Sequence, residues 1–122
     1  MSKKILLVDD EAQLVEMMTM RFEAAGYEVI SANDGQAALD KARNENPDLI
    51  ILDLMLPKMD GYKVCALLKK DSRYKDIPII LFSAKAQEED RKLGDEVGAD
   101  AYIAKPFEPE ELFGKIKQLL GE

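Results

Sequence analysis

Five reactive side chains come directly after short apolar segments of the chain. They are Asp9 and Asp10, Asp53, Ser83 and Lys105. If these segments are neighbouring parallel strands, their carboxyl ends meet at one edge of a sheet, where open α/β folds place their sites. The sequence therefore predicts that three carboxylates, one hydroxyl and one ammonium group converge at a single edge.

Three carboxylates that lie together need a compensating positive charge. Two of them about 4 Å apart repel by roughly 4 kcal/mol at an effective dielectric constant near 20, so the group must shift its pKa values, pair with a cation or bind metal. Lys105 alone cannot neutralise three carboxylates. Mg²⁺ binds one or two carboxylates, keeps several waters and commonly completes its shell with phosphate oxygens. The residue types therefore favour a magnesium site that receives a phosphoryl group.

Each of these residues also has an ordinary structural interpretation. Asp10 could be the N-cap of a helix, with Gln13 completing a capping box. Ser83 could be a polar loop residue and Lys105 an exposed lysine. Asp53 is harder to explain in this way, because a buried strand has no structural need for a carboxylate at its end. The expected convergence at one edge favours the functional interpretation.

Apolar segments of strand length alternate five times with longer amphipathic segments. This pattern predicts an α/β fold in which helices cover both faces of a parallel sheet. We expect strands at residues 4–8, 28–32, 48–52, 77–81 and 101–104. We expect helices at residues 11–25, 35–45, 60–70, 87–97 and 109–120. Gly26 is expected to end the first helix, Asp60 to cap the third and Pro109 to begin the last.

The composition bounds the function. A chain of 122 residues with 47% apolar residues predicts a single domain over residues 1–122, with no room for an output domain. The net charge of −7, with basic residues scattered among acidic ones, argues against direct binding of nucleic acid or anionic membranes. No apolar segment is long enough to span a bilayer and the N-terminus does not resemble a signal peptide, so we expect a cytoplasmic protein. Cys65 is the one cysteine, and its helical context predicts a buried small apolar residue.

Four motifs together resemble the receiver domain of response regulators in two-component signalling. They are Asp9-Asp10, the segment Pro47–Gly61 that contains Asp53, Ser83-Ala84, and the segment Gly98–Phe107 that contains Lys105. Each motif is modest alone, but their order and spacing are specific, and the resemblance covers essentially the whole chain. It implies a doubly wound, flavodoxin-like (βα)5 sheet with strand order 2-1-3-4-5.

The resemblance also implies the roles of the site residues. Asp53 would accept a phosphoryl group from a sensor histidine kinase or a small phosphodonor. Asp10, Asp53 and the backbone carbonyl of Met55 would bind Mg²⁺, and Asp9 would contribute through water. Lys105 would pair with a phosphoryl oxygen. The protein would catalyse its own phosphorylation and dephosphorylation without turning over a separate substrate, so it would not be an enzyme in the usual sense.

A switch follows from the same resemblance. Ser83 would hydrogen-bond another phosphoryl oxygen, and Tyr102 would fill the space that the serine hydroxyl leaves. The helix at 87–97, the strand at 101–104 and the helix at 109–120 would then form the face that changes. Tyr102 could equally be an ordinary half-buried aromatic residue.

The partners implied are a sensor histidine kinase and an unknown downstream protein. In this family the kinase docks on the first helix and on the loop after the last strand. Met17 and Met20 lie off the apolar stripe of the first helix, so we expect them to face solvent. They could form an adaptable surface for the kinase together with Phe107, or they could equally be ordinary surface methionines. Phosphorylation could also produce a homodimer, as in receivers of winged-helix transcription factors, although Ala101 stands where that class usually has an aspartate. The residues that resemble the dimer contacts are Arg91, Glu111, Asp100 and Lys115.

Three alternatives remain at this point. A haloacid-dehalogenase-like phosphatase also uses an aspartate nucleophile, but it needs a second carboxylate two residues later, where this chain has Met55. A flavodoxin-like cofactor binder needs a first loop rich in glycine, serine or threonine, which is absent. A receiver that acts without phosphorylation is the third. Within the receiver interpretation, Met55 and Lys85 would border the phosphoryl group and influence its hydrolysis.

Overall fold

Five parallel strands form one sheet in the order β2-β1-β3-β4-β5. The structure is a computed structural model that describes residues 2–84 and 88–122. The strands are β1 (Lys4–Val8), β2 (Glu28–Ala32), β3 (Leu49–Asp53), β4 (Ile79–Ser83) and β5 (Ala101–Ala104). The helices are α1 (Ala12–Ala24), α2 (Gly35–Glu45), α3 (Gly61–Lys70), α4 (Glu88–Glu96) and α5 (Pro109–Leu120). The predicted fold class and strand order are confirmed.

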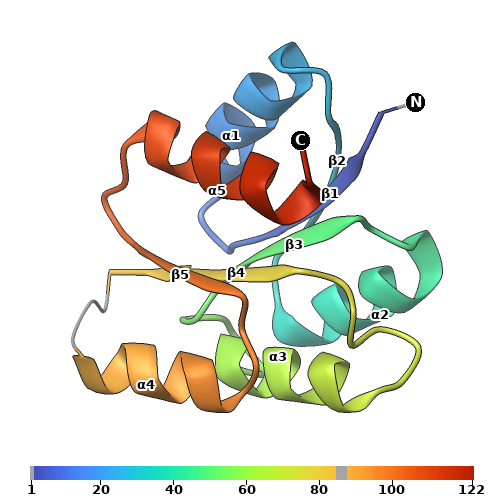
Figure 1. Cartoon of the computed structure of the whole chain (residues 1–122), viewed down its shortest axis with the longest axis vertical. Coiled ribbons are helices and arrows are strands. Elements are labelled where there is room, and N and C mark those ends of the chain that lie inside the picture. Colours follow the sequence, from blue (N-terminus) through green and yellow to red (C-terminus); the bar gives the residue numbers. More distant parts are fainter. Residues whose placement is uncertain (1, 85–87) are drawn as a thin grey trace.

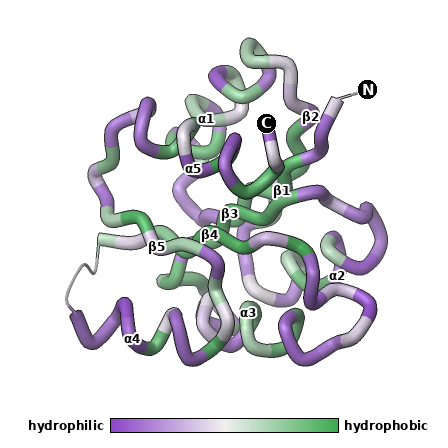
Figure 2. Tube along the Cα trace, in the orientation of Figure 1, coloured by the Kyte–Doolittle hydropathy of each residue, from purple (hydrophilic) through white to green (hydrophobic). Residues whose placement is uncertain are grey.

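Helices cover both faces of the sheet. Helices α1 and α5 lie on one face, and α2, α3 and α4 lie on the other (Figure 1). Strands β1, β3 and β4 are almost wholly buried because they lie between neighbours and between two helical layers. Their apolar side chains alternate between two cores, one on each face. In Figure 2 the strands at the centre are coloured mostly as hydrophobic, whereas many residues of the surrounding helices and loops are coloured as hydrophilic.

Some element boundaries differ from the prediction. Strand β3 spans Leu49–Asp53 and not 48–52, and β4 spans Ile79–Ser83 and not 77–81. Strand β4 begins late because Pro78 has no N–H to donate to a neighbouring strand. As a result, Asp53 and Ser83 are the last residues of their strands.

The helices also differ at their ends. Helix α1 covers 12–24 and not 11–25, α3 covers 61–70 and not 60–70, and α4 covers 88–96. Residue 87, the expected first residue of α4, lies outside the described part of the chain. The helices predicted at 35–45 and 109–120 are confirmed.

The expected helix signals are mostly confirmed. Asp60 caps α3 by accepting the N–H of Lys63 at 2.9 Å, Pro109 begins α5, and Gly26 has the positive φ of 96° that ends α1. The capping box at Asp10 is wrong. The N-cap of α1 is Glu11, which makes no side-chain capping bond.

Buried Cys65 behaves as an apolar core residue. Its Sγ lies 3.6 Å from the carbonyl oxygen of Val97, and burial raises the pKa of the thiol to about 11. The thiolate that nucleophilic chemistry requires is therefore disfavoured. This confirms the prediction of a buried residue.

Within the described residues, none of the helices has both the length and the apolar character that a bilayer span requires.

Gly114 gives a test of the packing of α5. It lies inside the helix, and an added Cβ would meet no atom within 4 Å. Gly114→Ala should therefore raise the free energy of unfolding by about 0.5–1 kcal/mol, measured by urea denaturation, because alanine removes the entropic cost of a helical glycine. Gly94→Ala in α4 is the matched control. Its Cβ would lie 3.3 Å from Cδ2 of Tyr102, so its gain should be smaller. Equal gains at both positions would contradict this account of the packing.

Candidate functional site

The described core contains three buried residues with polar or charged side chains: Asp9, Asp53 and Ser83. Asp9 directly follows β1, Asp53 ends β3 and Ser83 ends β4. These strands are parallel, so the three side chains lie at the same edge of the sheet. The predicted convergence at this edge is confirmed.

Lys105 joins this cluster from the end of β5. Its Nζ lies 3.0 Å from Oδ2 of Asp9, 3.3 Å from Oδ2 of Asp53 and 3.3 Å from Oε1 of Glu11. The ammonium also lies 4.6 Å from the centre of the Phe82 ring, a cation–π contact. Strand β4 separates β3 from β5, so the lysine side chain crosses β4 over Phe82 to reach Asp53.

The backbone around Lys105 is also well defined. Its N–H donates to the carbonyl oxygen of Ser83 at 2.8 Å, which extends the pairing of β4 and β5 by one residue. The peptide bond between Lys105 and Pro106 is cis, an option that X–Pro bonds have. Lys105 is therefore fixed by its backbone as well as by three carboxylates.

The carboxylates form a candidate metal centre. Oxygen atoms of Asp9, Asp10 and Asp53 lie within 4.8 Å of one another. The Lys105 ammonium is already shared by Asp9, Asp53 and Glu11, so a divalent cation would offset the remaining negative charge. All the donors are hard oxygen atoms, and exposed Asp10 leaves the centre open to water, as Mg²⁺ requires. The residues present therefore fit Mg²⁺.

The loop after β3 folds over this centre. The Met55 N–H donates to Oδ1 of Asp53 at 3.1 Å, and the Leu54 N–H donates to the carbonyl oxygen of Phe82. The Met55 side chain is exposed, so its backbone is the part that faces the carboxylate. The backbone of Met55 thus lies next to Asp53, where its carbonyl was expected to serve as a ligand.

Burial and charge shift the pKa values of the two central groups. Burial raises the pKa of Asp53, and the Asp9 carboxylate adds to this effect, whereas the Met55 N–H and Lys105 oppose it. Burial alone would lower the pKa of Lys105, but its hydrogen bond to Asp9 and the charges of Asp53, Asp9 and Glu11 raise it overall. Lys105 therefore stays protonated, and a second cation would favour the ionised form of Asp53.

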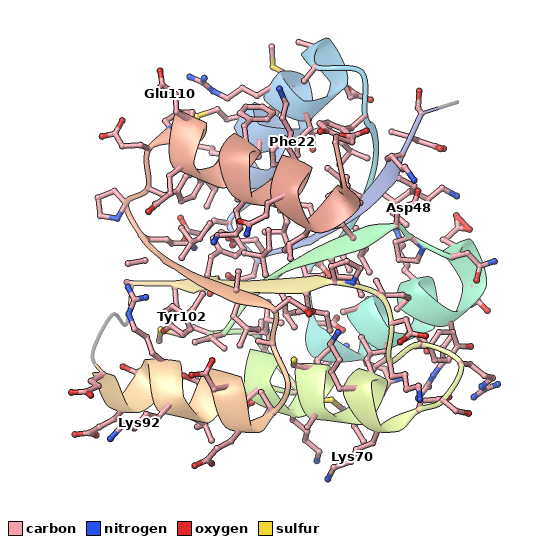
Figure 3. The ribbon with its side chains drawn as sticks, in the orientation of Figure 1. Phe22, Asp48, Lys70, Lys92, Tyr102 and Glu110 are labelled. Carbon is pink, nitrogen blue, oxygen red and sulfur yellow. The ribbon has the colours of Figure 1, made fainter. Side chains whose placement is uncertain are left out.

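Ser83 and Tyr102 lie on the same face of the sheet. Leu81 pairs with Tyr102 across β4 and β5, and Ser83 follows Leu81 by two residues. Figure 3 shows Tyr102 on the side of the sheet that α4 covers. Its ring packs against Gly94, where an added Cβ would lie 3.3 Å away, and the Arg91 guanidinium stands 5.3 Å from the ring centre.

Sequence reasoning missed three residues, two that contact Lys105 and one that lies beside Tyr102. Glu11 shares Lys105 with the aspartates, and Phe82 supports the ammonium. Tyr62 of α3 donates its hydroxyl to the carbonyl oxygen of Asp90 in α4 at 2.9 Å. Burial and the neighbouring Tyr62 hydroxyl raise the pKa of Tyr102. The acidic Glu11 after two aspartates was the one signal visible in the sequence.

Two of the residues expected at a dimer surface, Asp100 and Arg91, already have partners within their own chain. Asp100 accepts from Nζ of Lys69 and from the N–H of Ile79, both at 2.8 Å, within its own chain. Arg91 stacks on Tyr102, whereas Glu111 lies on the exposed surface of α5. Lys85, which was expected to border the phosphoryl group, lies outside the described residues.

An apolar groove lies beside the site. It has a volume of about 380 Å³ and is lined by α1, α5 and the loop after β5, including Met17, Pro106, Phe107 and Phe113. Met20 lies on the neighbouring surface of α1 with 66% of its area exposed. The prediction that Met17 and Met20 face solvent is confirmed.

Comparison with known proteins shows a match over nearly the whole chain. The family model described as response regulator receiver domain matches residues 5–117. The alkaline phosphatase synthesis transcriptional regulatory protein PhoP of Bacillus subtilis (strain 168) is 48% identical over 120 residues, which cover 98% of this chain and 49% of that protein. The chain thus spans about half the length of the curated relatives it matches.

Solved structures with the same fold are also similar. A putative response regulator from Chloroflexus aurantiacus has a TM-score of 0.94 at 36% identity, with 100% of both chains covered. The receiver domain of a sensor histidine kinase from Pseudomonas aeruginosa, described with a magnesium ion in its active site cleft, has a TM-score of 0.91 at 30% identity, also with 100% of both chains covered.

The raised pKa of Asp53 predicts that its charge costs stability when metal is absent. Folding with a raised pKa favours the protonated form, so stability should fall as pH rises from about 3.8, the ordinary value, through the pKa of the folded protein. Asp53→Asn should remove this loss and raise the free energy of unfolding at pH 7 by about 1 kcal/mol. Urea denaturation in EDTA at several pH values measures the free energy of unfolding of both proteins.

Asp40→Asn, at an exposed carboxylate of α2, is the control and should change stability little. Excess Mg²⁺ should stabilise the wild type more than Asp53→Asn. A wild type that is more stable than Asp53→Asn in EDTA at pH 7 would show that the carboxylate is not electrostatically strained.

Proposed function

Because the chain belongs to the response regulator receiver domain family, we propose that it is a switch that accepts a phosphoryl group on Asp53 in the presence of Mg²⁺. The observation that carries this proposal is the position of the Asp53 carboxylate. It is buried at the edge of the sheet, 3.3 Å from the Lys105 ammonium and beside Asp9 and Asp10. A carboxylate in these surroundings can act as a nucleophile towards phosphorus.

The proposed reaction is an in-line displacement. A carboxylate oxygen of Asp53 forms a bond to phosphorus, while the bond from phosphorus to the leaving group breaks. The leaving group is the imidazole of a kinase phosphohistidine, or acetate when acetyl phosphate is the donor. Lys105 pairs with a phosphoryl oxygen and offsets charge in the loose transition state, and Ser83 donates its hydroxyl to another. Bound Mg²⁺ would neutralise charge on the phosphoryl oxygens.

The holders of the metal would be Asp10, Asp53 and the carbonyl of Met55, with Asp9 acting through water. Two observations support this assignment. The carboxylate oxygens lie within 4.8 Å of one another, and the Met55 N–H is already bonded to Asp53. Asp9 also accepts from Lys105 at 3.0 Å, so part of its charge is already compensated. This fits a less direct role than that of exposed Asp10.

We propose that phosphorylation changes the face formed by α4, β5 and α5. The phosphoryl group adds about two negative charges and strong acceptors, which attract the Ser83 hydroxyl, and Tyr102 on the same face then moves towards the vacated space. Helix α4 would follow Tyr102, because Gly94 is its one buried residue and packs on that ring.

A sensor histidine kinase is the proposed phosphodonor. Receiver domains interact with such kinases, and the groove between α1, α5 and the loop after β5 offers an apolar surface next to Lys105. Exposed Met17 and Met20 can adapt to a partner helix because methionine is flexible. The kinase helix would then present its phosphohistidine to Asp53.

The whole protein's output is a further proposal. Its curated relatives are named as transcriptional regulators and are about twice as long. The net charge of −7 favours protein partners for this stretch of chain over nucleic acid. A cytoplasmic location stays a prediction. The haloacid-dehalogenase-like alternative is not favoured, since the family match covers residues 5–117 and Met55 offers no general acid.

Intact-mass measurement after incubation with acetyl phosphate and Mg²⁺ tests the proposal. The wild type should gain the mass of one phosphoryl group, and Asp53→Ala should gain none because the nucleophile is absent. Asp40→Ala, which removes an exposed carboxylate, is the control and should label like the wild type. Undiminished labelling of Asp53→Ala would reject the assignment. A wild type that stays unlabelled while folded would favour the receiver that acts without phosphorylation.

Dimerisation on phosphorylation is a separate proposal. Arg91, Glu111, Asp100 and Lys115 would form charged pairs between two copies, with Asp100 first released from Lys69. Size-exclusion chromatography at high protein concentration should show a larger species after a phosphoryl mimic such as beryllofluoride is added. Glu111→Lys should abolish this shift, and adding Lys115→Glu tests whether reversed charges restore it. An unchanged elution position for the wild type would remove the dimer proposal.

A further inference from the structure

The loop that covers the site contains a strained turn. The Met59 N–H donates to the carbonyl oxygen of Pro57 at 2.7 Å, and Lys58 between them has a φ of 68°. This is a γ-turn with positive φ, an uncommon and strained conformation for a residue other than glycine. Such strain persists where surrounding contacts over-determine the backbone.

The start of α2 supplies those contacts. Oδ2 of Asp34 lies 3.5 Å from Nζ of Lys58, and the Gly35 N–H donates to the carbonyl oxygen of Pro57 at 3.5 Å. A Cβ on Gly35 would lie 2.5 Å from the carbonyl oxygen of Met59 and 2.6 Å from its Cβ. Any side chain at Gly35 would therefore displace the turn.

Asp34 is itself held in place. Its Oδ1 accepts the N–H of Ala37 at 2.8 Å, so it caps α2 while its other oxygen faces Lys58. This hydrogen bond is the main reason that the pKa of Asp34 is lowered, and the Lys58 charge adds to it. The contact between α2 and the loop thus combines a fixed carboxylate with a close backbone approach.

The other end of the loop is joined to the site. The Met55 N–H bonds to Asp53, and the Gly61 N–H donates to the carbonyl oxygen of Leu54 at 3.0 Å. Only two residues separate Met55 from the γ-turn residue Lys58 on the same short loop. A displacement of the turn would be transmitted to the backbone of Met55, because the loop is short and the start of α3 packs closely against its first residues. An added Cβ at Gly61 would lie 2.5 Å from the carbonyl oxygen of Asp53.

We propose that Asp34 and Gly35 are positioning residues for the metal centre. By holding the γ-turn at Lys58, they keep the backbone of Met55 beside Asp53, where its carbonyl completes the oxygen ligands. This inference rests on the proposed function, because it assumes that Mg²⁺ binds at this edge. It adds a role for the start of α2, which contributes no ligand.

Gly35→Ala is the direct test. The added methyl group should displace the turn and weaken Mg²⁺ binding by about tenfold, as loss of support around a metal ligand does. Titration of ¹⁵N-labelled protein with MgCl₂, followed by NMR, gives the affinity. The same spectra give a readout without metal, because the Met55 amide resonance should already shift in EDTA. Gly114→Ala, whose methyl group meets no atom within 4 Å, is the matched control and should leave both readouts unchanged.

A milder pair of variants keeps the test valid if Gly35→Ala does not fold. Lys58→Met and Asp34→Asn each remove the ion pair, and the asparagine oxygen can still cap α2. Each should weaken Mg²⁺ binding by about twofold, in line with the small energy of an exposed pair. The double variant should bind Mg²⁺ about as tightly as either single variant, because the two substitutions remove the same ion pair.

The outcomes separate this inference from the proposed function. If the wild type does not bind Mg²⁺ at this edge, the proposed function fails and the inference fails with it. If the wild type binds Mg²⁺ and folded Gly35→Ala binds it equally well with an unmoved Met55 amide, the inference alone is overturned. Equal affinity in Lys58→Met, Asp34→Asn and the wild type would likewise overturn the role of the ion pair.

Discussion

The excess of negative charge at one edge of the sheet is the constraint on which the site depends. Asp9 and Asp53 are buried there, Asp10 lies within reach of both, and Lys105 is the ammonium that faces them. Burying carboxylates costs free energy unless they are paired. Burial raises the pKa of Asp53 by more than the Met55 N–H and Lys105 lower it. A divalent cation would offset the negative charge that the chain alone leaves at this edge.

The sheet order explains how residues distant in sequence form this arrangement. Strands β1 and β3 are neighbours, so the carboxylates that follow their apolar cores meet at one edge. Lys105 comes from β5, beyond β4, and its side chain is long enough to pass over Phe82. The loop after β3 covers the centre and is itself held by the starts of α2 and α3. The packing of these two helix starts thus bears on the geometry of the proposed metal ligands.

The sequence predicts the strands well, and it also predicts that these side chains meet at one edge of the sheet, because both signals are local. Strand β3 has an unbroken apolar core and ends on Asp53, and that pattern alone indicates both a buried strand and a carboxylate at its end. The alternative interpretation of Asp10 as an N-cap is wrong, since Glu11 is the N-cap of α1 and its N–H donates to Oδ1 of Asp9 at 2.8 Å. The roles of Tyr62 and Gly35 depend on tertiary contacts with α4 and Met59, and no local pattern identifies them.

The most direct test of the central claim is calorimetric titration of the metal-free protein with MgCl₂, comparing the wild type with Asp10→Asn. Asp10 is exposed, so the substitution should leave the fold intact while removing one ligand. One Mg²⁺ should bind per wild-type chain, and Asp10→Asn should show a large loss of affinity. A wild type that binds no Mg²⁺, or an Asp10→Asn variant that binds it with unchanged affinity, would show that these carboxylates do not form a metal centre.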